Sequence, residues 1–188
     1  MRLKTYDSRL KTQDSRLKTM NTDQTISQQQ IWTWLEEVID PEIPVLNVVE
    51  MGIVRDVEFE GDQVIVKITP TYSGCPAMNA IEVEIRKKLK EKGIVDFFVK
   101  TDFSKSWTTD WMTDHAKKKL KEYGIAPPEK TEMDDDFLAS LKNKNKIVPC
   151  PFCDSLETEL QSEFGSTACK SQYYCHGCSQ PFEHFKCI

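Results

Sequence analysis

The chain has 188 residues and a formal net charge of −5, and 29% of its residues are charged. The first nineteen residues carry a net charge of +4, so residues 20–188 carry −9. A domain that binds phosphate backbones usually has a basic face, so this acidity argues against nucleic-acid binding as the main function. No stretch reaches the roughly 18 apolar residues of a membrane-spanning helix, and the expected location is cytoplasmic.

The N-terminal segment repeats a seven-residue unit, RLKT-x-DS, with one leucine in each copy. A coiled coil needs two apolar positions in each heptad, so this repeat cannot form one. A basic arm that contacts nucleic acid or anionic lipid is one alternative. The regularity of the repeat and the second methionine favour translation of a tandem DNA repeat upstream of a start at Met20. We therefore expect residues 1–19 to be disordered, as a spurious extension outside the fold.

The first predicted element is a helix that begins after Ser27, whose side chain is a suitable N-cap. Its apolar residues recur at helical spacing: Ile31, Trp34, Leu35 and Val38. Pro41 and Pro44 are expected to end the helix and to force an extended connection.

A β-hairpin is predicted next, because two alternating segments flank a Glu-Gly-Asp turn at 60–62. The side chains expected to face the core are Ile53, Val57 and Phe59 before the turn and Val64, Val66 and Ile68 after it. An amphipathic helix follows, with Pro76 in its first turn, Gly93 as its C-cap, and core-facing Ile81, Ile85 and Leu89.

A third strand in 94–103 and a helix from residue 109 to Gly124 complete the first domain. Trp107 and Trp111 are four residues apart and are expected on one helical face, where core packing is the default. A docking patch for a partner is the alternative, because exposed tryptophans are frequent binding hot spots.

Together these elements predict an α+β domain over residues 20–126, in which a small mixed sheet carries helices on one face. Residues 127–149 are rich in proline, then acidic, then rich in lysine and asparagine, and are expected to form a linker. Six of the seven cysteines lie in the remaining segment, residues 150–188.

That segment contains two C-x2-C pairs separated by 21 residues: Cys150 with Cys153, and Cys175 with Cys178. Each pair can direct two thiolates at one ion, so the two pairs predict a tetrahedral all-sulfur site. A segment of 39 residues cannot bury a sufficient core by itself, so metal binding would supply its folding free energy. We predict a four-cysteine zinc ribbon over residues 150–188, although iron of the rubredoxin type suits the same ligands.

Two cysteines lie outside these pairs, Cys169 and Cys187. Packing within the strands of the ribbon is their expected role, and exchange with one of the four ligands is the alternative. His176 and His184 are expected at the surface, because four thiolates already complete a site. Two basic residues against five acidic ones argue against a ribbon that binds nucleic acid.

In the first domain, Cys75 stands just before a predicted helix. Free N–H groups and the positive end of the helix favour a thiolate there. Asp40 and Glu42 follow the first helix and are expected to face the same place, so transient binding of a soft metal suits this set; a packed structural cysteine is the alternative. A cysteine hydrolase is disfavoured, because the only histidine of this domain is His115, in a lysine-rich helix.

The segments DPEIPVLNVVEMGIVRDV and TPTYSGCPAM resemble the SufT-like domain family, which is associated with iron–sulfur cluster assembly. The family pattern combines DPE, a Leu-Gly element and a T-x-x-x-C-P turn, and this chain has Met51 in place of the leucine. Residues 20–188 as a whole resemble the accessory subunits of the phenylacetyl-CoA epoxidase system. The further segments that contribute to this resemblance are WTTDWM, EYGIAPP, CPFC, FGSTACK and QPFEHFKC.

This resemblance implies an accessory role in aerobic phenylacetate degradation, namely help in maturing the iron–sulfur or di-iron centres of the oxygenase and reductase subunits. It also implies two sets of site residues. A metal or cluster transfer site is expected at Asp40, Glu42, Thr71 and Cys75, and a zinc site at Cys150, Cys153, Cys175 and Cys178.

The expected partners are the other epoxidase subunits, with no nucleic acid and no membrane, and a homodimer is left open. The chain has no Glu-x-x-His pair and no dinucleotide fingerprint, so it is not expected to be the catalytic subunit. Two alternatives stay open: a structural adaptor that transfers no metal, and an electron carrier that uses an iron-loaded four-cysteine site.

Overall fold

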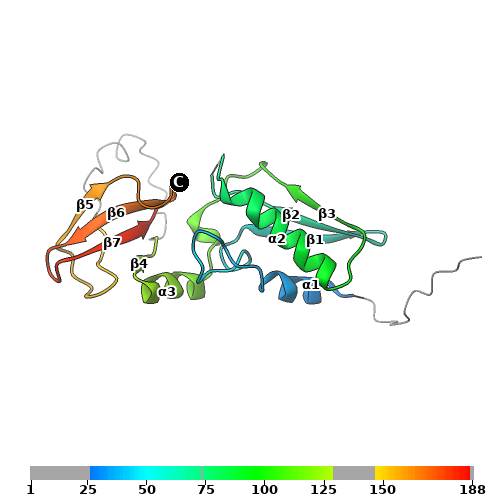
Figure 1. Cartoon of the computed structure of the whole chain (residues 1–188), viewed down its shortest axis with the longest axis horizontal. Helices are drawn as coiled ribbons and strands as arrows, with labels where there is room; N and C mark the ends of the chain where they lie inside the picture. The colour runs from blue at the N-terminus through cyan, green and yellow to red at the C-terminus, as the bar shows by residue number, and fades with distance from the viewer. Residues whose placement is uncertain (1–25, 73, 129–146, 187–188) are drawn as a thin grey trace, which may run out of the picture.

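The structure is a computed structural model that describes residues 26–72, 74–128 and 147–186. Two β-sheets lie at the two ends of the molecule, with helices beside them (Figure 1). The expected N-terminal extension lies outside the described residues, as does most of the expected linker. No helix within the described ranges has the length and apolar character needed to cross a bilayer.

Helix α1 (Gln28–Leu35) begins at the predicted cap. The Ser27 hydroxyl accepts a hydrogen bond from the Gln30 N–H at 3.2 Å, and the Gln30 side chain accepts one from the Ser27 N–H at 2.8 Å. This capping box satisfies two of the N–H groups left open at a helix start. The helix ends at Leu35, well before Pro41. The next residues have already left the helix, because the Val38 carbonyl accepts a hydrogen bond from the Val48 N–H of the following loop at 3.0 Å.

Strands β1 (Val54–Glu60) and β2 (Gln63–Ile68) form the predicted antiparallel hairpin, with Glu60 opposite Gln63. Strand β3 (Phe97–Thr101) pairs parallel with β2, so the sheet is mixed and has the order β1-β2-β3. The expectation for Phe59 is wrong: it is 43% exposed, because it lies beside the hairpin turn, where it lines a surface cavity with Ile26.

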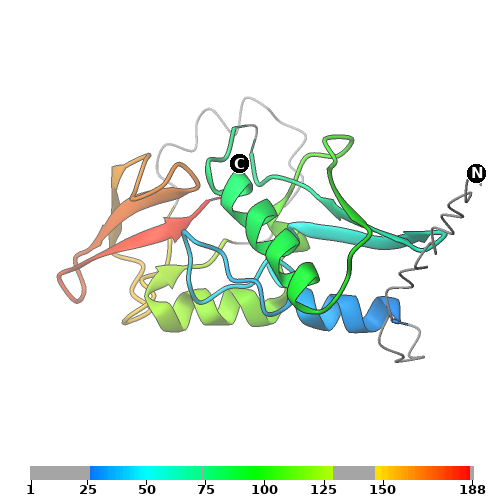
Figure 2. The ribbon, with the colours of Figure 1, turned by 45° about the vertical axis from the view of Figure 1, so that its right-hand side comes forward.

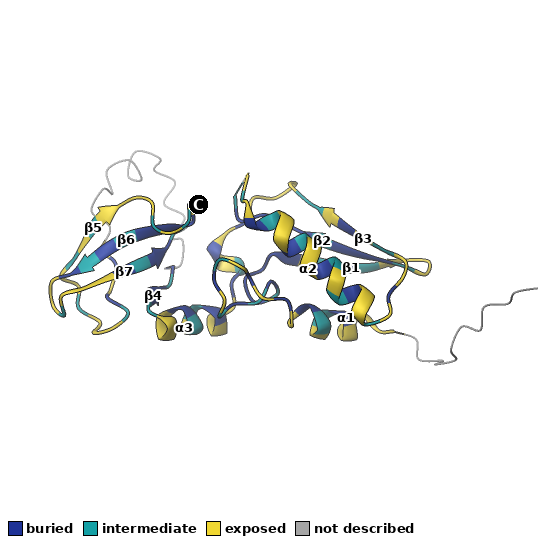
Figure 3. Cartoon of the chain, in the orientation of Figure 1, coloured by how far each residue is buried: buried dark blue, intermediate teal, exposed yellow. Residues whose placement is uncertain are grey.

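Helix α2 (Ala77–Glu91) connects β2 to β3 and buries the three predicted residues Ile81, Ile85 and Leu89. Helices α1 and α2 contact each other as well as the strands, so both cover the same face of the sheet, as predicted (Figure 3). Gly93 follows α2 with φ of +83°, and its N–H donates to the Lys90 carbonyl at 3.0 Å.

The predicted helix after residue 109 is divided into a 3₁₀ turn, η1 (Thr109–Trp111), and helix α3 (Asp114–Tyr123). The two tryptophans therefore do not share a helical face. Trp107 precedes η1 and is 2% exposed, which confirms the core-packing prediction for this residue. Trp111 is half-buried, with the Arg55 guanidinium 3.5 Å from its ring centroid.

A second sheet has the order β4-β7-β6-β5 and consists of β4 (Ile125–Ala126), β5 (Thr158–Ser162), β6 (Lys170–Cys175) and β7 (Gln180–Phe185). Strand β4 directly follows α3 and Gly124, and it pairs parallel with β7. The last two residues of the expected first domain thus lie in the sheet of the ribbon. Helices α1 and α3 run along the same side of the molecule in both views (Figure 1, Figure 2).

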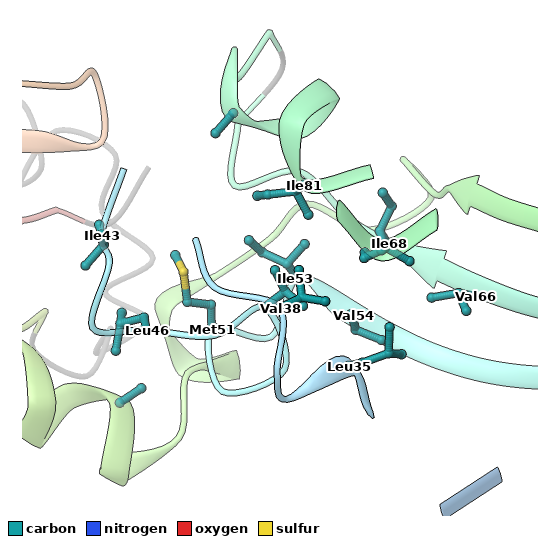
Figure 4. Packing of buried hydrophobic residues seen from close by; sticks show 14 of the residues in the cluster. Leu35, Val38, Ile43, Leu46, Met51, Ile53, Val54, Val66, Ile68 and Ile81 are labelled. Carbon is teal, nitrogen blue, oxygen red and sulfur yellow. The ribbon is translucent and has the colours of Figure 1, made fainter. Parts of the chain in front are cut away.

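One continuous core joins the two ends of the molecule. Its central part contains Leu35 of α1 and the loop residues Ile43, Leu46 and Met51 (Figure 4). The same cluster extends to Cys169 and Phe185 of the ribbon. A smaller cluster lies inside the ribbon and consists of Ala126, Val148, Cys150, Tyr173, Cys175 and Phe182.

Gly52 is required where the loop before β1 passes η1. Its φ is +70°, and an added Cβ would lie 2.7 Å from both the Cβ and the carbonyl oxygen of Trp111. Gly52→Ala is expected to destabilise the protein by about 2–4 kcal/mol, from the left-handed backbone and from overpacking. Gly61→Ala is the matched control, because Gly61 has φ of +61° but no atom within 4 Å of the added Cβ. Urea unfolding should show the larger loss for Gly52→Ala, and equal losses would contradict the steric argument.

Candidate metal centres

The four paired cysteines of the ribbon converge on one point. Their sulfur atoms all lie within 4.8 Å of one another, with Cys150 Sγ 3.7 Å from Cys178 Sγ and Cys153 Sγ 3.6 Å from Cys175 Sγ. Two similar turns create this arrangement, because the residue after each C-x2-C pair has a left-handed backbone: Asp154 at φ +58° and Ser179 at φ +57°.

These distances fit a tetrahedral thiolate site. A metal–sulfur bond of about 2.3 Å in tetrahedral geometry separates the sulfurs by about 3.8 Å, whereas a disulfide would bring them to about 2.05 Å. All six described cysteines are free thiols. Burial opposes ionisation of Cys175, but hydrogen bonds from the Cys178 N–H and from neighbouring thiols outweigh it and lower the pKa of Cys175 to about 7. The spacing of the four sulfurs therefore suits one metal ion, as the two C-x2-C pairs predict.

Asp40 organises the loop after α1. It is 4% exposed, and its Oδ1 accepts hydrogen bonds from the N–H groups of Glu42 at 2.7 Å and Ile43 at 2.8 Å. Burial raises the pKa of Asp40, against the opposing effects of these hydrogen bonds and of the Lys170 charge. The carboxylate thus fixes the turn that positions Glu42.

Glu42 reaches from this turn to the ribbon. Its Oε2 lies 3.8 Å from the Sγ of Cys169, a residue 127 positions later in the chain. Burial, and then the charge of Asp40, raise the pKa of Glu42, while Lys170 opposes the rise. The two carboxylates predicted for the transfer site therefore do lie close together, but they also face the ribbon.

Cys75 lies two residues before α2, and its side chain is half-buried against the main core. The N-cap of α2 is Pro76, which offers no side-chain hydrogen bond to the helix start. Burial raises the pKa of the neighbouring Tyr72, and the Cys75 thiol, Glu42 and Cys169 raise it further, because such charge interactions strengthen as the groups approach one another. The structure thus brings Cys75 into the same locality as Glu42.

Thr71 is buried in the same loop as Cys75. It lines a cavity of about 260 Å³ with Tyr72, Trp107 and Phe103, and no contact between Thr71 and the two carboxylates is found among the described residues. The role expected for Thr71 in metal transfer stays a prediction.

Two residues of this locality were not predicted to belong to it: Cys169 and Lys170. Cys169 is packed, as expected, but against Glu42 and the main core and not only within the ribbon. The segment FGSTACK, which contributes to the family resemblance, contains both of these residues and was their signal in the sequence. Cys187 lies outside the described residues.

The surface position expected for His184 is wrong. It is 4% exposed, its ring meets that of Tyr173 edge-on at 5.7 Å, and its Nδ1 lies 3.4 Å from the Ser171 hydroxyl. Strand β7 alternates, so this position faces the interior of the ribbon. His176 is exposed, as expected, and its Nε2 lies 3.2 Å from Glu159.

The fold and the thiolate cluster define a class of protein: an α+β domain joined to a four-cysteine metal ribbon. Sequence comparison divides the chain in the same way. Residues 28–121 match the family of iron–sulfur cluster assembly proteins, and residues 134–186 match the PaaD zinc beta ribbon domain.

Two curated relatives are covered over most of their own length. A component of the Escherichia coli K12 "Putative 1,2-phenylacetyl-CoA epoxidase" is 44% identical over 159 residues, which are 85% of this chain and 92% of that protein. The Porphyromonas gingivalis W83 protein "Fe-S protein maturation auxiliary factor" is 33% identical over 103 residues, 54% of this chain and 97% of that protein. A solved domain of unknown function from Bacillus anthracis, DUF59, is 28% identical and covers 50% of this chain and 90% of its own, with a TM-score of 0.46. The chain belongs to the PaaD family, in which an iron–sulfur cluster assembly domain precedes a zinc ribbon.

Proposed function

We infer that the protein is an accessory subunit of a phenylacetyl-CoA epoxidase, and that it helps to supply iron or an iron–sulfur cluster to the oxygenase and reductase subunits. The relationship to the E. coli protein supports the epoxidase system as the setting. The match of residues 28–121 and the P. gingivalis relative support a role in iron–sulfur maturation.

The observation that carries this proposal is the locality of Cys75. A half-buried thiol at a helix start, with the carboxylates of Asp40 and Glu42 close by, offers both soft and hard ligands to an iron cargo. Partial exposure allows the cargo to enter and to leave. In this proposal Asp40 holds the turn, and Glu42 and Cys75 contact the metal.

The four ribbon cysteines have a different task in this proposal. Their closed tetrahedral set suits a structural zinc ion, which supplies folding free energy and has no open coordination position for chemistry. The alternative, an electron carrier with iron at these thiolates, predicts a coloured protein with a reversible redox signal. Purified protein that is colourless and holds about one zinc per chain would exclude it.

The test of the transfer role uses Cys75→Ala in a strain that lacks the wild-type protein. The variant should fold and keep its ribbon metal, whereas the iron content and ring-epoxidising activity of the partner subunits should fall to the level of the deletion strain. Asn79→Ala, an exposed change on the first turn of the same helix, is the control and should restore both. Full restoration by Cys75→Ala would refute the role of this thiol and would favour a structural adaptor.

A further inference from the structure

The junction between the two ends of the molecule contains a second thiol. Cys169 lies just before β6, is 4% exposed, and has its Sγ 3.8 Å from Glu42 Oε2 and 3.0 Å from Thr167 Oγ1. Burial raises the pKa of Tyr72, and Cys75, Glu42 and Cys169 raise it further, so the two thiols and the Glu42 carboxylate lie around one phenol. Cys75 and Glu42 come from the assembly domain and Cys169 from the ribbon, so both parts of the chain contribute a thiol to one locality.

The charges around this thiol are not balanced. Lys170 is 4% exposed, and its ammonium lies 3.0 Å from the Glu183 carboxylate. Burial raises the pKa of Asp40 and of Glu42, and the positive charge of Lys170 opposes this rise at both carboxyl groups. Among the residues that the structure describes here, the Lys170 ammonium thus interacts with three carboxylates, all of them at least half-buried. Charges removed from water need compensation, so an additional cation is favoured at this place.

Two thiols and a carboxylate are a ligand set for a soft or borderline divalent metal. Thiolates select zinc and iron, and a carboxylate is a suitable third ligand for either. We propose that Cys169 of the ribbon and Cys75 of the assembly domain together bind one divalent iron or similar metal ion, with Glu42 as the third ligand. This inference rests on the proposed function, since it identifies how the Cys75 site holds its cargo.

The proposed site is wider than the ribbon site before metal binds. Within the described ranges, the four paired cysteines are the one group of three or more ligands whose donor atoms all lie within 4.8 Å of one another. Binding at the junction therefore draws Cys75 and Cys169 toward Glu42 and releases the protons of both thiols. The metal then links the ribbon to the assembly domain, which gives the ribbon a function beyond its own stability.

Anaerobic titration of the full-length, zinc-loaded protein with Co²⁺ alone tests this site. Wild type should bind one Co²⁺ beyond its zinc, with near-ultraviolet charge-transfer absorption from two thiolates and no loss of zinc. Cys169→Ser should halve this absorption and weaken Co²⁺ binding at least about tenfold. Cys75→Ser should have the same effect, and the double variant should lose the absorption.

Two further variants make the result specific. Glu42→Gln, a change of similar size at a half-buried position, should weaken binding but keep the two-thiolate absorption. Ser171→Ala is the matched control, a change of similar size at a buried residue two positions after Cys169, and should bind Co²⁺ like wild type. Zinc content and thermal melting verify that each variant is folded.

The outcomes separate the two proposals. If Cys75→Ser loses the Co²⁺ signal while Cys169→Ser binds like wild type, the shared site is refuted and the proposed function of Cys75 stands. If wild type binds no Co²⁺ beyond its zinc, the shared site is refuted as well, and the iron content of the partner subunits decides the proposed function independently.

Discussion

Cys175→Ser is expected to abolish metal binding by the ribbon and to unfold the second sheet. The hydrophobic cluster inside the ribbon has six buried members among the described residues, and two of them, Cys150 and Cys175, are themselves expected ligands. So small a core cannot offset the conformational entropy of the segment without the metal, whose binding contributes about 10–16 kcal/mol in comparable structural sites. Strand β4 pairs with β7, so the end of α3 should loosen too.

Three measurements check this result: zinc content of the purified chain, limited proteolysis, and far-ultraviolet circular dichroism. The variant should lose the metal expected in the ribbon and should be cleaved within residues 147–186, whereas the first sheet stays protected. Cys169→Ser makes the same chemical change outside the set of four thiolates and should retain zinc. A Cys175→Ser protein with a full complement of zinc and a protected ribbon would show that these sulfurs are not the ligands.

Trp107→Ala is expected to destabilise the whole chain by about 3–5 kcal/mol, as other truncations of large buried aromatic residues do. The indole is 2% exposed, and its Nε1–H donates to the Met51 carbonyl at 3.0 Å. Its ring meets Phe185 edge-on, with 6.0 Å between the centroids. Because Phe185 ends β7, removing this ring should weaken the attachment of the ribbon to the assembly domain as well as the core.

Two variants separate these effects in urea unfolding followed at equilibrium. Trp107→Phe keeps a ring against Phe185 but leaves the buried Met51 carbonyl without its donor, at a cost of about 1–3 kcal/mol. Trp111→Ala is the control, because it removes a half-buried ring whose contact with Arg55 contributes about 0.5–2 kcal/mol. If Trp107→Ala costs no more than Trp111→Ala, Trp107 does not hold the two parts together.

The contacts of Trp107 and Trp111 explain why the family pattern has a glycine after residue 51. The Met51–Gly52 pair, in place of the usual Leu–Gly, provides the carbonyl that Trp107 binds and the close approach to Trp111. Lys119 of α3 reaches the same loop, with its ammonium 3.0 Å from both carboxylate oxygens of Glu50, which is 7% exposed. The loop that positions Asp40 and Glu42 is thus held from two sides.

The sequence alone determined the features whose partners are near neighbours in the chain. Ser27 and Gln30 form the capping box within one turn, Ile81 and its successors follow the helical period, and each C-x2-C pair makes its own turn. The period, the cap and the turn depend on a few adjacent residues, so they can be recognised without the rest of the molecule.

Only the tertiary structure decided which distant segments meet. Cys169 approaches Glu42 across 127 positions, Ile125 and Ala126 join the sheet of the ribbon, and His184 is turned into its interior. These contacts form when the assembly domain and the ribbon pack on one core. The local sequence pattern of either part does not indicate which of its residues will face the other part. For the same reason the ribbon thiol at the junction could be predicted as buried, but not as a neighbour of the assembly domain's carboxylates.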